Sequence, residues 1–128
     1  MPRLKTETFG GGDQSWLGST HGIANARTEI LDISTFTAGT HYPNGYIPSG
    51  LPVAKVSGVL VPYDATEGTT TGAGILAGFV LTDQPVVGTA DFGVPLLDHG
   101  RVKTANLPIS FTAPTAAAKR AATTIVFV

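Results

Sequence analysis

Short runs of β-branched and apolar residues, separated by clusters of Gly, Pro and Thr, make up most of the chain from Thr28 onward. Such runs are typical of strands, because β-branched side chains fit a pleated sheet and because Gly and Pro interrupt it. Several prolines fall at the ends of these runs, where a missing N–H is tolerated. The pattern predicts strands over residues 28–36, 53–57, 59–61, 75–81, 86–90, 94–97, 101–105 and 125–128.

The alternation of apolar positions shifts by one residue between Val56 and Val59. Ser57 and Gly58 lie at this shift, and Gly adopts a positive φ without steric cost. We therefore expect a turn or a β-bulge at this dipeptide.

One segment has a helical composition, TAAAKRAA at residues 115–122. It follows Pro114, and Thr115 is a candidate N-cap. A helix of about two turns does not persist alone, so it has to pack against the strands. The predicted fold class is mainly β, a small barrel or sandwich with one short helix.

Residues 1–27 are rich in Gly, Ser, Thr and Asn, and their apolar positions follow neither the period of a strand nor that of a helix. We interpret them as a flexible N-terminal arm, and residues 28–128 as a β-rich domain. The arm nevertheless contains bulky apolar side chains, at Phe9, Trp16, Leu17 and Ile23.

Trp16 is the only Trp of the chain, and a solvated tail rarely carries such a residue. Two hypotheses account for it. Either the arm folds on contact with a partner, or Trp16 packs against its own domain. The sequence leaves both open.

The composition changes the picture in one respect. Charged residues make up only 13% of the chain, about half the usual share of roughly 25%. Large uncharged surfaces mark contact with a partner, so we expect an oligomer. The net charge is −1 and basic residues do not cluster, which argues against binding to nucleic acid or to an anionic membrane.

The chain contains no Cys, which excludes a disulfide framework, a thiolate metal site and a Cys nucleophile, and is expected of a cytosolic protein. The first residues lack the apolar core of a signal peptide, and no segment approaches the roughly 20 apolar residues of a membrane helix. We expect neither export by that route nor a membrane anchor.

Candidate chemistry is sparse. The three histidines, His21, His41 and His99, lie far apart and lack metal-ligand spacing. Asp98 precedes His99 directly, but adjacent residues of an extended chain point to opposite faces, so a turn over residues 97–100 explains the pair better than a catalytic triad.

Two further polar segments also lack the context of a site. Residues 68–74, GTTTGAG, lack the Lys of a phosphate-binding loop. Asp64 and Glu67 fall in an open loop, whereas a general acid needs an apolar pocket that raises its pKa. We therefore predict no catalytic residue, no metal site and no cofactor.

The stretch GYIPSGLPVAKVSGVLVPYD, followed by TTTGAGILAGFVLTD, resembles the central segment of phage head decoration proteins of the lambda type. The resemblance covers about residues 30–87 and extends only loosely over residues 91–108. Its residues are those of packing and turns, so they identify a fold better than a binding site. The matching positions are Ile47, Pro48, Gly50, Val53, Lys55, Gly58, Pro62, Tyr63, Asp64, Ala73, Gly74, Ile75 and Leu76.

The resemblance implies a β-tulip-like domain that forms homotrimers on the outside of the expanded phage head. Such trimers bind at three-fold or quasi-three-fold positions and stabilise the head against the pressure of packaged DNA. The protein would be made in the host cytoplasm and would reside on the outer surface of the virion capsid.

In this family the N-terminal arm orders against the major capsid protein. The resemblance therefore makes the four apolar arm residues, Phe9, Trp16, Leu17 and Ile23, the candidate capsid contacts. Deletion of residues 1–22 is expected to leave a folded trimer that binds the capsid orders of magnitude more weakly.

Two alternatives come from other functional classes. The first is a glycan-binding or adhesion module on the virion surface, which would stack sugars on Tyr42, Tyr46 and Trp16. The second is a small hydrolase that would use Asp98 and His99.

Overall fold

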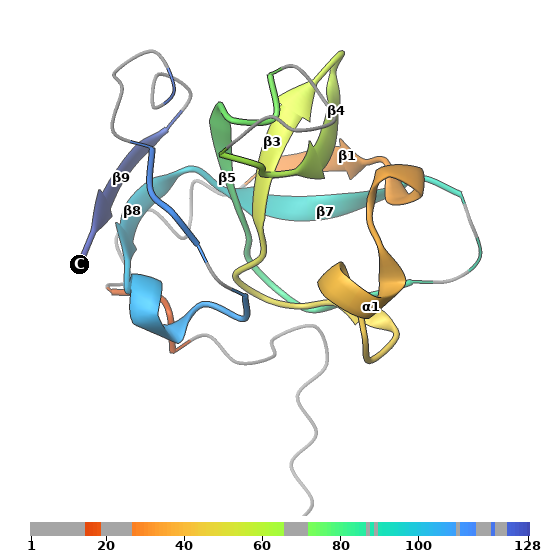
Figure 1. Cartoon of the computed structure of the whole chain (residues 1–128), viewed down its shortest axis with the longest axis horizontal. Helices are drawn as coiled ribbons and strands as arrows, with labels where there is room; N and C mark the ends of the chain where they lie inside the picture. Colours follow the sequence, from red (N-terminus) through yellow and green to blue (C-terminus); the bar gives the residue numbers. More distant parts are fainter. Residues whose placement is uncertain are drawn as a thin grey trace, which may run out of the picture.

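The computed structural model describes residues 15–18, 27–65, 72–86, 88, 90–109, 111–114, 119 and 123–128. These residues form a mainly β structure, which confirms the predicted fold class (Figure 1). None of the helices among them is long and apolar enough to cross a membrane.

Five strands close into a small barrel with the order β1-β4-β3-β5-β7. They are β1 (Arg27–Leu31), β3 (Pro52–Val56), β4 (Val59–Pro62), β5 (Leu76–Val80) and β7 (Phe92–Leu97). All neighbours pair antiparallel except β1 and β4, which meet in parallel at Leu31 and Leu60. Strand β7 closes the barrel by pairing along the whole of β1.

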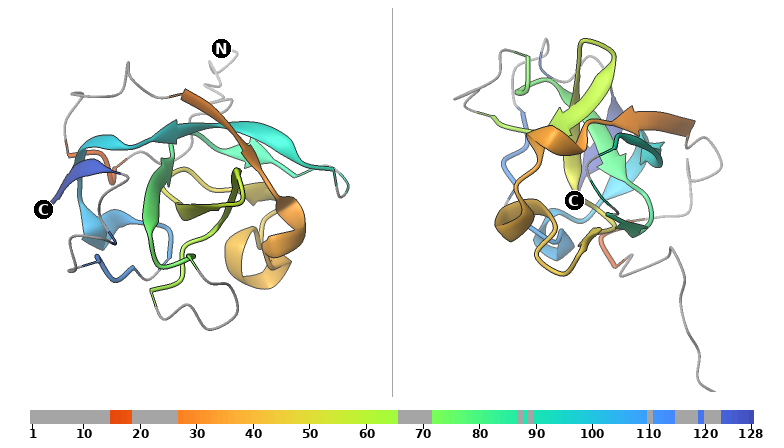
Figure 2. Two further views of the ribbon diagram at one scale, coloured as in Figure 1. Left: turned by 90° about the horizontal axis from the view of Figure 1, so that it is seen from above. Right: turned by 90° about the vertical axis from the view of Figure 1, so that its right-hand side faces the viewer.

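Two small sheets lie outside the barrel. Strand β2 (Tyr46–Ile47) pairs antiparallel with β6 (Gln84–Pro85), and β8 (His99–Val102) pairs in parallel with β9 (Thr124–Phe127). The β8–β9 sheet lies at one end of the molecule and helix α1 (Ala38–His41) at the other, as both Figure 1 and the left view of Figure 2 show.

The described helices are short. The 3₁₀ turn η2 (Ile33–Thr35) follows β1 at once, because the Asp32 carboxylate accepts a hydrogen bond from the Ser34 N–H and caps it. The predicted strand over residues 28–36 therefore ends at Leu31. A second 3₁₀ turn, η3 (Thr104–Asn106), shortens the strand that was predicted over residues 101–105.

Helix α1 closely follows residues 28–36, which the sequence predicted as a strand, and it overlaps a Thr-Ala-Gly-Thr cluster with no helical pattern. It is a single turn, closed by hydrogen bonds to the carbonyls of Thr37 and Ala38. The helix predicted over residues 115–122 lies outside the described residues except for Lys119. In the described part of residues 86–90 no strand is present, and the nearby pairing is at Gln84–Pro85.

The turn predicted at Ser57 and Gly58 is confirmed, since both residues have positive φ, 54° and 85°. This two-residue hairpin places Ala54 opposite Val61. The shift in apolar alternation therefore leaves these two residues on the same face, where they pack together with Ala73.

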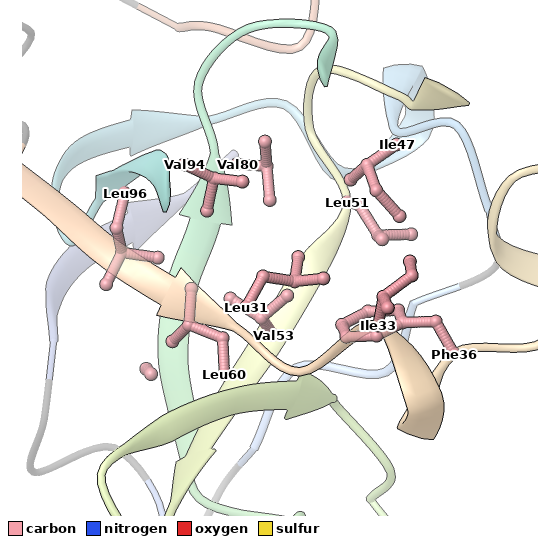
Figure 3. Packing of buried hydrophobic residues seen from close by; sticks show 11 residues of the cluster. Leu31, Ile33, Phe36, Ile47, Leu51, Val53, Leu60, Val80, Val94 and Leu96 are labelled. Atoms are coloured by element: carbon pink, nitrogen blue, oxygen red, sulfur yellow. The ribbon is translucent and has the colours of Figure 1, made fainter. Parts of the chain in front are cut away.

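The barrel interior holds the main hydrophobic core. Its side chains come from the barrel strands, from the Ile47–Leu51 segment and from the η2 turn, and Figure 3 shows most of them pointing into a common interior. The buried members are Leu31, Ile33, Phe36, Ile47, Leu51, Val53, Leu60, Ala77, Val80, Val94 and Leu96.

A second core lies between the barrel and the β8–β9 sheet. Its buried members are Trp16, Leu76, Phe79, Leu97, Val102 and Ile125. Strand β5 contributes to both cores, and all five of its residues are buried. A strand normally offers alternate residues to each face, but β5 has a bulge opposite β3, where Val53 pairs with Gly78 and Ala54 with Leu76.

Gly78 allows β5 to contribute to both cores. Its φ is +150°, and a Cβ atom there would lie 2.4 Å from the carbonyl oxygen of Leu97 on β7. Only Gly satisfies both the conformation and the close approach of the two strands.

We predict that Gly78→Ala lowers the free energy of unfolding by at least about 2 kcal/mol, because the methyl group meets backbone that cannot move away. Gly39→Ala in α1 is the matched control, since a Cβ atom added at Gly39 would have no neighbouring atom within 4 Å. It should change the free energy by less than about 1 kcal/mol. Urea unfolding measures both, and equal effects would contradict the role assigned to Gly78.

Candidate functional site

Trp16 lies in the second core, fully buried. Its indole Nε1–H donates a hydrogen bond to the Ser49 hydroxyl (3.0 Å), and its ring packs against Phe79 with 5.8 Å between the ring centroids. Of the two hypotheses for Trp16, the structure therefore shows the one in which it packs against its own domain. In this conformation the indole is not available to a capsid protein or to a sugar.

Backbone hydrogen bonds hold the chain on both sides of Trp16. The Lys103 N–H donates to the Trp16 carbonyl (2.6 Å), and the Gly18 N–H donates to the Arg101 carbonyl (2.9 Å). Leu17, which is half-buried, forms a bridge with Val102 between them. Residues 15–18 are thus attached to the edge of β8, whereas Phe9 and Ile23 lie outside the described residues.

Within residues 47–50, Ser49 and Gly50 lie against the indole ring. Gly50 has a φ of +91°, and a Cβ atom there would lie 2.8 Å from the Trp16 ring. Its N–H donates to the Val80 carbonyl (2.6 Å), which holds the segment against β5. We call Trp16 together with residues 47–50 the Trp16 socket.

Ser49 joins this socket to the loop after β5. Its hydroxyl accepts from Trp16 and donates to the Leu81 carbonyl (2.7 Å). Its N–H donates to the Asp83 carboxylate (2.7 Å). The hydroxyl and the N–H of buried Ser49 therefore both have hydrogen-bond partners that lie far away in the sequence.

The other residues of the decoration-protein resemblance occupy structural positions. Lys55 forms an ion pair with Glu29 (3.0 Å), and the Tyr63 hydroxyl donates to the Thr112 carbonyl (2.8 Å). The Asp64 N–H donates to the Ala73 carbonyl (2.8 Å). Of the remaining positions, Gly58 forms a hairpin turn and Pro62 ends a strand. Gly74 lies in a buried turn, Ile75 is exposed and Leu76 is a core residue.

A surface cavity of about 250 Å³ lies beside the socket. Three separate parts of the chain line it: residues 40–49, Asp83 and residues 106–109. Sequence reasoning missed this cavity, because its walls are more than 20 residues apart and carry no local pattern. The alternative that placed sugars on three aromatic residues retains only Tyr46 here, since Tyr42 packs against the barrel core and Trp16 is buried.

His41 contributes to the wall of the cavity. Burial lowers the pKa of its imidazole below the usual value of 6.5. Its Nδ1 accepts a hydrogen bond from the Thr37 N–H (2.8 Å), so in the neutral ring the proton lies on Nε2. The ring also meets Phe36 edge-on.

The structure gives Asp98 and His99 roles in strand pairing. His99 Nδ1 forms a hydrogen bond with the Thr124 hydroxyl, and the Thr124 N–H donates to the Asp98 carbonyl (2.9 Å). Both bonds connect β8 to β9. Among the described residues, no group of three or more His, Cys, Asp or Glu side chains is placed to hold a metal ion. His21 and Glu67 lie outside those residues.

Comparison with known proteins adds no relative, since no family model matches the chain and no curated protein is significantly similar to it. We therefore infer function from the structure and from the sequence resemblance.

We predict that Trp16→Ala lowers the free energy of unfolding by about 3–5 kcal/mol, the usual cost of truncating a buried aromatic residue. Deletion of residues 1–22 should cost a similar amount, which corrects the expectation that this deletion leaves the fold intact. Deletion of residues 1–14 is the matched control and should leave the free energy nearly unchanged. Urea unfolding followed by far-UV circular dichroism measures all the variants, because Trp16→Ala and the 1–22 deletion both remove the only Trp and its fluorescence.

For His41 we predict a dependence of stability on pH. Because the folded pKa is lower than the unfolded one, the unfolded chain takes up a proton first as the pH falls through 6.5, and stability is lost there. His41→Asn keeps a hydrogen-bond acceptor for the Thr37 N–H but does not titrate. Thermal unfolding should show a shallower loss of stability for this variant between neutral and mildly acidic pH. Identical slopes would refute the assignment.

Proposed function

We propose that the protein is a phage capsid decoration protein. It binds as a homotrimer to the outside of the expanded head, at three-fold or quasi-three-fold positions, and stabilises the head against the pressure of packaged DNA. Its partners are its own copies and the major capsid protein, and its role is structural, with no catalysis and no cofactor.

The observation that carries the proposal is the Trp16 socket. Ile47, Pro48 and Gly50 are the opening positions of the decoration-protein motif. Gly50 lies directly against the Trp16 ring, and the neighbouring Ser49 accepts the hydrogen bond from its indole. A capsid contact made by residues before Ser15 would pull directly on the folded domain, because residues 15–18 are bonded to β8. A protein that clips capsid subunits together needs such a direct mechanical connection.

The surface of the domain also supports a protein partner. Exposed apolar side chains occur on β1, before β5 and around β9: Ile30 (47% exposed), Ile75 (36%), Val126 (50%) and Val128 (56%). Combined with the low content of charged residues, these side chains favour a surface that is covered by other protein chains.

The Trp16 socket reduces the number of arm residues that are expected to contact the capsid. Trp16 and Leu17 are used within the domain, so of the four apolar arm residues only Phe9 and Ile23 remain as candidates. A single short segment binds weakly, because ordering each residue costs about 1–2 kcal/mol of backbone entropy. Three segments on one trimer raise the overall affinity by about 10² to 10⁴, since the later contacts become intramolecular.

We predict a trimer mass by light scattering and saturable binding to expanded, but not to unexpanded, phage heads in a sedimentation assay. Deletion of residues 1–14 should preserve the trimer and weaken binding by about 10² to 10⁴. Phe9→Ala should weaken it in the same direction, and Thr8→Ala is the matched control. A monomer in solution, or no binding to either form of head, would contradict the proposal.

A further inference from the structure

The cavity beside the Trp16 socket has polar groups that the fold leaves available. Ser49 N–H occupies one oxygen of the Asp83 carboxylate, and within the described residues no hydrogen bond reaches the other oxygen. The side-chain amide nitrogen of Asn106 donates to the Ser15 carbonyl (3.0 Å). The side-chain oxygen of Asn106 accepts no hydrogen bond from any described residue. Both side chains are therefore fixed in place and retain an acceptor.

Donors complement these acceptors. The neutral ring of His41 carries its proton on Nε2, because Nδ1 accepts the Thr37 N–H. The Tyr46 hydroxyl forms no hydrogen bond with any other described residue, and its strand β2 is held by pairing with β6. Donors and acceptors thus line one cavity on short, anchored segments.

The rest of the lining is apolar and has flat surfaces. Pro48 and Pro108 lie in the wall together with Ile109 and the ring of Tyr46. A sugar ring has the matching character, since its hydroxyl groups lie around the edge and its C–H bonds cover the faces. Ligand sites are typically apolar with a few placed polar groups, as here.

Charge and size restrict the ligand further. Among the described residues that line the cavity, Asp83 is the only carboxylate and there is no Lys or Arg. An anionic ligand would meet an uncompensated negative charge. The volume of about 250 Å³ lies just below the roughly 300–1,000 Å³ of sites for larger ligands, so it suits a single ring.

We infer that this cavity binds one neutral sugar residue of a glycan. Asp83 and Asn106 accept hydrogen bonds from its hydroxyl groups, His41 and Tyr46 donate to its oxygens, and the apolar wall covers one face of its ring. The inference does not rest on the capsid proposal. On a virion, such a site would let the decoration layer attach reversibly to a glycan-coated surface.

The test is a titration of the full-length, ¹⁵N-labelled protein by NMR. The probes are the methyl glycosides of glucose, galactose, mannose and N-acetylglucosamine, with methyl glucuronide as an anionic probe and choline as a cationic one. We expect at least one neutral glycoside to shift the amide signals of Tyr46, Ser49, Asp83 and Asn106, with a dissociation constant of about 0.1–10 mM.

Two variants identify the site. Asp83→Asn keeps an acceptor for the Ser49 N–H but removes the charge, and should weaken binding at least about tenfold. Tyr46→Phe keeps the ring and removes the donor, and should weaken it several-fold. Asp91→Asn, an exposed residue outside the lining, is the matched control and should bind as the unmodified protein does. Circular dichroism verifies that each variant is folded.

The inference is overturned if no neutral glycoside shifts these signals, if only the charged probes do, or if both variants bind as tightly as the control. Head binding separates it from the capsid proposal. Asp83→Asn should attach to expanded heads like the unmodified protein, so either idea can fail while the other stands.

Discussion

The hydrogen bond from the Trp16 indole to the Ser49 hydroxyl connects two segments that are 33 residues apart in the sequence. It joins residues 15–18 to the loop between β2 and β3, and through Ser49 to the Leu81 carbonyl and the Asp83 carboxylate. A buried indole N–H without a partner costs about 1–3 kcal/mol, so this bond fixes where the ring lies. Because the ring fills the second core, the β8–β9 sheet and the barrel are held together around it.

The same contact organises the surface. The backbone around Trp16 bonds to β8, and the Ser15 carbonyl holds Asn106 in the wall of the cavity. Ser49 fixes Asp83, which also lines this cavity. A structural core and a candidate binding surface therefore share one set of bonds. The direct link between the first described residues and the domain also suits a protein whose N-terminal segment has to transmit force.

Sequence patterns predicted the parts of the fold that local chemistry decides. The turn at Ser57 and Gly58 follows from the conformational freedom of Gly, and the strand type follows from β-branched runs. Helix α1 was missed because it is one turn held by contacts of His41 with Thr37, which leaves no period to detect. The double burial of β5 was missed because the bulge at Gly78 depends on the approach of Leu97, far away in the sequence.

The role of Trp16 was the least predictable feature, since its partner Ser49 is 33 residues away. A hydrogen bond between distant residues leaves no local sequence pattern. The sequence did show two unusual residues at this contact, the isolated Trp16 and the Gly of IPSG, but nothing that joins them. Hydrogen exchange of the Trp16 indole Nε1–H reports directly whether this bond holds the two cores together. If it does, the indole proton should be protected as strongly as the backbone amides of β5 and β7. Exchange at the rate of an exposed indole would contradict the role assigned to Trp16.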